Sequence, residues 1–203
     1  MSGPITEYGL GLAEGWHLLP YGDASEGWER ELAGAILEGV EAPEGVPAAL
    51  AAQLAEVRAA VDATGVRGAR TAVLVESPAE PFVQAMLTLV VGRRVGRGTY
   101  ESQLAQVAEG VGSAQVMGTQ EIDAVVPAGT VHGAHFLIGH LPQDEDVAGV
   151  HLEERVHLGV FPADSPDMVD VTAIAAGIGI FDDFPAFVVG LLDELEVSTG
   201  VAA

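Results

Sequence analysis

The alternation of apolar and polar side chains from His151 to Phe161 constrains the fold more than any other feature of the sequence. Successive side chains of a strand point to opposite faces, so a strand with one buried face shows this period of two. The apolar members of one face are Leu152, Val156, Leu158 and Val160. The segment therefore predicts a half-buried strand, and residues 114–126 and 131–140 predict two further strands of the same sheet.

Four other segments carry apolar residues at the spacing of three to four that is typical of amphipathic helices. They are residues 28–40, 47–63, 99–108 and 184–195. Pro47 and Pro185 suit the first turn of a helix, because proline there loses no hydrogen bond. The predicted N-caps are Asp23 or Ser25 for the first helix, Thr99 for the third and Asp182 or Asp183 for the last.

The order of these segments predicts the fold class. Residues 69–75 and 82–94 are extended segments that flank a turn, which indicates a hairpin. Residues 168–180 predict a further strand after residues 151–161. We therefore expect one α+β domain over residues 1–203, an antiparallel β-sheet with three to four helices packed against it. The tail, residues 198–203, is expected to be frayed.

The charge of the chain limits its partners. The formal net charge is −22, from 30 acidic residues and 8 basic ones, and all the basic ones are arginines. Such a surface repels nucleic-acid phosphates and anionic membranes. The chain also shows no secretory signal and no apolar run long enough for a membrane helix. We expect a cytoplasmic protein with no nucleic acid and no membrane insertion, whose partner is another protein or a second copy of itself.

Several kinds of catalytic site are excluded by composition. The chain has no cysteine and no lysine, which excludes disulfides, thiolate nucleophiles, Schiff bases and the lysine of a phosphate-binding P-loop. The glycine run from Gly9 to Gly15 leads into an extended segment, whereas a dinucleotide loop leads into a helix. We assign no catalytic residues and no cofactor, and we favour a protein that is not an enzyme. An enzyme built on carboxylates and histidines is the remaining alternative.

The histidines offer a candidate metal site. His140 and His151 flank one loop, and they approach each other if the strands on either side of that loop pair. Asp144 and Asp146 lie within the loop and supply oxygen ligands. The alternative, which we favour, is that the histidines are exposed on the solvent face of a hairpin.

Arginines cluster in one part of this acidic chain. Arg70, Arg93, Arg94 and Arg97 fall within or beside the predicted hairpin, where they form a candidate site for an acidic partner. The alternative is that these arginines pair with the abundant carboxylates of the same chain, and we favour this alternative.

The element order resembles the PsbP-like fold family, which includes a photosystem subunit, a Ran-binding import factor and secretion chaperones. The opening Leu12-Ala13-Glu14-Gly15-Trp16 and the closing strand–strand–helix over Val156–Phe161, Val169–Ile180 and Phe184–Leu195 carry the resemblance. It implies binding or scaffolding rather than catalysis. The function that we predict is a non-catalytic protein-binding, adaptor or chaperone-like module. The alternative is a protein that binds a metal or a small ligand through its histidine-bearing hairpin.

Overall fold

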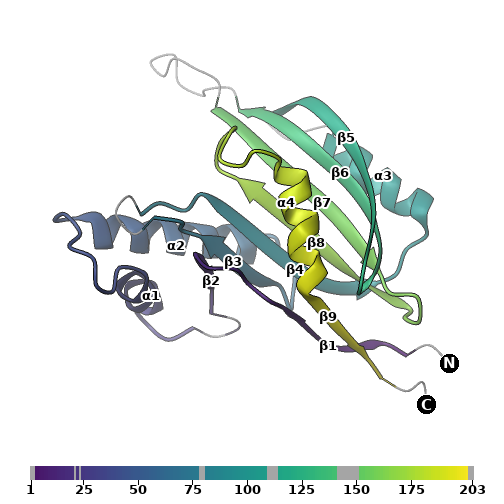
Figure 1. Cartoon of the computed structure of the whole chain (residues 1–203), viewed down its shortest axis with the longest axis horizontal. Helices are drawn as coiled ribbons and strands as arrows, with labels where there is room; N and C mark the ends of the chain where they lie inside the picture. Colours follow the sequence, from purple (N-terminus) through teal and green to yellow (C-terminus); the bar gives the residue numbers. More distant parts are fainter. Residues whose placement is uncertain are drawn as a thin grey trace. The chain divides into compact units, whose positions relative to one another are not determined.

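The computed structural model describes residues 3–20, 22, 24–77, 81–108, 114–140 and 151–200. The chain divides into two compact units (Figure 1). The small unit is Leu12–Val90, and the large unit combines Met1–Gly11 with Val91–Ala203. The expected single domain over residues 1–203 stays a prediction. Among the described residues, no helix is both long enough and apolar enough to span a bilayer.

The small unit contains three antiparallel strands and two helices. The strands are β2 (Trp16–Leu18), β3 (Arg70–Leu74) and the first part of β4 (Ala85–Arg93). Arg70 lies opposite Leu89 in the β3–β4 pair, which confirms the predicted hairpin. The core consists of apolar side chains of helices α1 and α2 packed on the strands, among them the fully buried Leu50, Leu54 and Val73.

Glycines, not polar side chains, begin both helices of the small unit. Helix α1 (Trp28–Ile36) follows Gly27, and α2 (Val46–Ala63) follows Gly45. Both glycines adopt a left-handed backbone, with φ of 82° and 90°, which glycine tolerates without strain. The predicted cap Ser25 is therefore wrong, and Asp23 lies outside the described residues. The prediction that proline stands in the first turn of α2 is confirmed.

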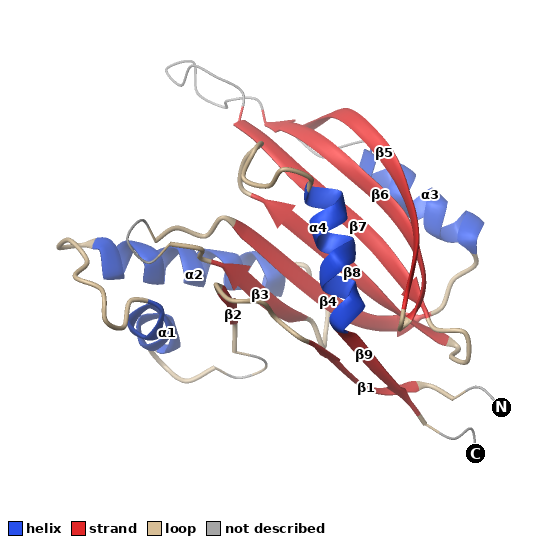
Figure 2. Cartoon of the chain, viewed as in Figure 1, coloured by secondary structure: helices blue, strands red, loops and turns tan. Residues whose placement is uncertain are grey.

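The large unit is built on a meander of four antiparallel strands (Figure 2). They are β5 (Ala114–Val126), β6 (Gly129–His140), β7 (His151–Phe161) and β8 (Asp167–Ala175), in the order β8-β7-β6-β5. The predicted bounds of β5 and β7 are confirmed. The prediction for β8 was too long, because residues 176–182 form bends and turns.

One helix covers each face of this meander. Helix α3 (Arg97–Ala108) packs Leu104 and Val107 on Ala134, Phe136 and Ile138 of β6. Helix α4 (Phe184–Leu191) lies across the opposite face (Figure 1). The α+β class with antiparallel sheets and four helices is confirmed. Because α3 begins at Arg97, the prediction of Thr99 as its cap is wrong.

The two ends of the chain form a second sheet that the sequence did not reveal. Strand β1 (Ile5–Leu10) pairs antiparallel with β9 (Leu195–Thr199), which follows a short 3-10 helix, Leu192–Glu194. Ser198 and Thr199, for which we predicted a frayed tail, are thus part of a strand. Residues 201–203 lie outside the described residues.

The cap of α4 gives a first testable prediction. The side chain of Asp183 accepts a hydrogen bond from the backbone N–H of Ala186 at 2.9 Å, so the structure selects Asp183 over Asp182. Replacing Asp183 with alanine should lower the free energy of unfolding by about 1 kcal/mol, because one N–H at the helix start loses its partner. Urea denaturation measures this loss. The Asp182→Ala variant is the control, and an equal loss in both variants would contradict the assignment.

Candidate functional site

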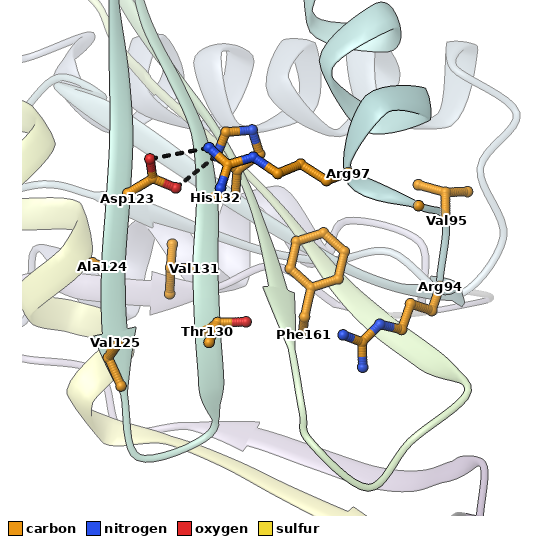
Figure 3. A pocket seen from close by; sticks show the side chains of 11 residues that line it. Arg94, Val95, Arg97, Asp123, Ala124, Val125, Thr130, Val131, His132 and Phe161 are labelled. Atoms are coloured by element: carbon orange, nitrogen blue, oxygen red, sulfur yellow. Dashed lines mark hydrogen bonds and ion pairs between the residues drawn. The ribbon is translucent and has the colours of Figure 1, made fainter.

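A cavity of about 510 Å³ lies in the large unit beside the start of helix α3 (Figure 3). We call it the α3 pocket. Arg94–Arg97 line one side, and Asp123–Val125, Thr130–His132 and Phe161 line the other. Ligand pockets in proteins have volumes of roughly 300–1,000 Å³, so this cavity has the size of a small-molecule site.

The hairpin of β5 and β6 sets one wall of the α3 pocket. Its turn joins Val126 to Gly129, and the register that follows places Asp123 opposite His132 and Val125 opposite Thr130. On the neighbouring strand β7, Phe161 lies opposite Thr130. Directly opposed residues of antiparallel strands share a face. These side chains therefore project on the face that α3 covers.

Four charged or titratable side chains join α3 to this wall: Arg97, Glu101, Asp123 and His132, which we call the charged quartet. The guanidinium of Arg97 donates from Nε to Glu101 Oε1 at 2.9 Å and from Nη2 to Asp123 Oδ2 at 3.2 Å. His132 lies between the same two carboxylates, with Nδ1 2.8 Å from Asp123 Oδ1 and Nε2 3.5 Å from Glu101 Oε1. The hydrogen bond with His132, together with the Arg97 charge, lowers the pKa of Asp123.

Arg94 differs from Arg97 because its charge is not compensated. Its Nη1 donates to the backbone oxygen of Pro162 at 3.1 Å, and its guanidinium carbon lies 5.5 Å from the centre of the Phe161 ring. Among the described residues, no carboxylate forms an ion pair with Arg94. In Figure 3 its guanidinium and the hydroxyl of Thr130 point toward the space on either side of Phe161.

Further titratable groups are buried next to the α3 pocket. The Tyr100 ring packs edge-on against Phe161, with ring centres 5.8 Å apart, and its buried hydroxyl has no hydrogen-bond partner among the described residues. Burial raises the pKa of Asp170 to about 6. Burial, with a smaller effect of the Arg155 charge, lowers the pKa of His157 to about 4. In Asp170 and His157, burial thus shifts the pKa toward the neutral form of the side chain.

The four arginines of the predicted partner site are divided between the two units. Arg70 begins β3 in the small unit, whereas Arg93, Arg94 and Arg97 belong to the large unit. Arg93 forms an ion pair with Asp167 at 3.4 Å and is mostly exposed. Only Arg94 and Arg97 line the same pocket. A site for an acidic protein partner at these arginines stays a prediction.

The two histidines of the predicted metal site do lie together. His140 and His151 are opposite each other in the β6–β7 pair, with ring centres 5.9 Å apart. His140 Nε2 lies 3.1 Å from Glu153 Oε2, and Arg155 engages the other oxygen of that carboxylate. Asp144 and Asp146 lie outside the described residues. Among the residues that are described, no group of three or more metal-ligating side chains is found. The metal site also stays a prediction.

Sequence reasoning missed most of the α3 pocket, including Asp123, Thr130 and Phe161. One signal for part of it was present. The predicted strands over residues 114–126 and 131–140 are separated by only a few residues, and counting back from that short turn places Asp123 opposite His132. Nothing comparable in the sequence places Arg94 and Arg97 over that hairpin.

Comparison with known proteins assigns no family. No protein-family model and no curated protein matches this chain. The resemblance to the PsbP-like family therefore stays a prediction.

Proposed function

We propose that this protein binds a small molecule with a carboxylate group and an apolar body in the α3 pocket. The observation that carries the proposal is the uncompensated guanidinium of Arg94 at a cavity of about 510 Å³. The protein-binding function predicted from the sequence stays a prediction. The cavity supports the small-ligand part of the alternative prediction. It lies beside His132 of the histidine-bearing strand β6, whereas the sequence pointed to His140 and His151.

Arg94 and Thr130 suit the head group of such a ligand. A guanidinium presents several N–H donors in a planar fork that matches the two oxygens of a carboxylate. Only Nη1 of Arg94 has a described acceptor, the backbone oxygen of Pro162. Thr130 makes no hydrogen bond through its side chain in the described part of the chain and adds a hydroxyl donor on the other side of Phe161 (Figure 3).

The remaining lining suits an apolar body. Val95, Val125 and Phe161 contribute apolar side chains to the lining of the pocket. The side chain of Val125 is 81% exposed, although most valines are buried in folded proteins. A ligand body that covers Val125 gains from removing this apolar surface from water.

Arg94→Gln gives the test of this function. We expect octanoate and 4-phenylbutyrate to bind the wild-type protein more tightly than their neutral amides do. The variant should bind the two carboxylates about tenfold more weakly, because it loses a charge-assisted hydrogen bond. Isothermal titration calorimetry measures both differences.

The matched control is Arg30→Gln, which removes an arginine that is 84% exposed in the small unit. This variant changes the net charge by the same amount as Arg94→Gln does. Because Arg30 does not line the α3 pocket, the variant should bind the carboxylates as the wild type does. Phenyl phosphate serves as a third probe. Its affinity, compared with that of the carboxylates, distinguishes a carboxylate site from a phosphate site. Equal binding of carboxylates and amides, or unchanged binding in Arg94→Gln, would overturn the proposal.

A further inference from the structure

The charged quartet holds a buried histidine between two carboxylates. The side chain of His132 is 8% exposed, Nδ1 lies 2.8 Å from Asp123, and Nε2 lies 3.5 Å from Glu101. A neutral imidazole has one N–H, so it donates to one carboxylate and turns a lone pair toward the other. Only the contact of Nδ1 with Asp123 is a hydrogen bond, and the buried Nε2 has no hydrogen-bond partner among the described residues. A proton on His132 turns both contacts into ion pairs, because both carboxylates lie within 4.0 Å of the ring.

The charges of the quartet also balance when His132 is protonated. Arg97 contributes one positive charge, and Glu101 and Asp123 contribute two negative charges. A neutral His132 leaves the quartet with a net negative charge, whereas a protonated His132 makes it neutral.

The position of the quartet connects this proton to the pocket. Arg97 and Glu101 belong to the first turns of α3, and Asp123 and His132 belong to β5 and β6. Arg97, Asp123 and His132 also line the α3 pocket. Any change in the contacts of His132 therefore acts on the helix start that forms one wall of that pocket.

We propose that protonation of His132 fastens the start of α3 to β5 and β6, and that ligand binding in the α3 pocket is therefore tighter at mildly acidic pH. The second clause rests on the proposed function, whereas the first concerns the protein alone. The two are tested by separate measurements.

Other titratable groups face this region and have to be controlled. From α3, Tyr100 packs against His132 with ring centres 6.2 Å apart, in addition to Arg97 and Glu101. From the sheet, Asp123 contacts His132, and Asp170 and His157 lie on the same face. Asp170 takes up a proton in the same pH range as an ordinary histidine, so the experiment is carried out in an Asp170→Asn background.

The first measurement is amide hydrogen exchange of residues 97–108 at about pH 8 and about pH 5.5, on either side of an ordinary histidine pKa. After correction for the intrinsic exchange rate, protection of α3 should be about threefold to tenfold greater at the lower pH. This difference should disappear in His132→Gln and in Glu101→Gln. Glu101 is half exposed, so its variant tests the proposal even where His132→Gln folds poorly.

The control variant is His151→Gln, which removes an exposed histidine from the far end of β7 and should keep the full pH difference. Equal protection of α3 at both pH values in the parent, or a pH difference that survives in Glu101→Gln, would overturn the proposal. The second measurement repeats the 4-phenylbutyrate titration at both pH values. If α3 responds to pH but the probe binds at neither, the proposed function fails and the role of His132 stands.

Discussion

The Gly133→Ala variant is expected to lose at least about 3 kcal/mol of its free energy of unfolding, the largest loss that we predict for a single methyl group. Gly133 lies in β6 opposite Leu158 of β7. A Cβ atom at this position would clash with the backbone oxygen of His157 and would lie 2.8 Å from the Cα atom of Leu158. These are backbone atoms of a paired strand, so a side-chain rotation cannot relieve the clash.

Urea denaturation followed by far-ultraviolet circular dichroism measures this loss. The matched control is Gly118→Ala on the neighbouring strand β5, where the nearest atom to a new Cβ is Leu137 Cβ at 3.8 Å, an ordinary contact. That variant should change the free energy of unfolding by less than about 1 kcal/mol. A Gly133→Ala protein as stable as the control would contradict the described β6–β7 pairing.

The second large effect is a gain of stability in Asp170→Asn. Burial raises the pKa of Asp170 from 3.8 to about 6. The folded state therefore binds the proton more tightly than the unfolded state does, and stability is lost as the pH rises from 3.8 through 6. Asparagine keeps the shape without the charge. At pH 7 we expect the variant to be more stable by about 1–2 kcal/mol, a value reduced for the partial exposure of Asp170.

The pH dependence identifies the cause of this gain. Below about pH 3 the carboxyl is protonated in both states, so wild type and Asp170→Asn should be equally stable there. Asp164→Asn, an exposed change in the turn before β8, is the control and should leave stability at pH 7 unchanged. A gain of equal size at all pH values would show that the charge of Asp170 is not its cause.

The sequence predicted the parts of the fold that local patterns determine. The alternation over residues 151–161 predicted β7 with its observed bounds, although Glu154 interrupts the apolar face, and Pro47 marked the start of α2. The N-cap of α1 was predicted wrongly because Asp23 and Ser25 have the side chains that usually cap helices. The helix instead begins after Gly27, which takes a left-handed backbone. Strand β9 was missed because it is short and its partner β1 is at the opposite end of the chain.

The candidate site depended on contacts between distant segments. Counting from one turn relates Asp123 to His132, and so this pair is accessible to sequence reasoning. The contact of Arg97 with Asp123 requires that α3 lies over β5 and β6, which the apolar face of that helix alone does not determine. The predicted arginine cluster contained Arg94 and Arg97, but proximity in sequence did not show that Arg93 would pair with Asp167 instead.

The most direct test of the α3 pocket is a titration of the isotope-labelled protein with 4-phenylbutyrate, followed by the chemical shifts of its backbone amides. We predict saturable changes confined to the pocket wall, at residues 94–97, 123–125, 130–132 and 161. Neutral 4-phenylbutyramide should cause much smaller changes at the same concentrations. Absence of changes at these amides at millimolar probe, or changes only in the small unit, would contradict the assignment of the α3 pocket as the ligand site.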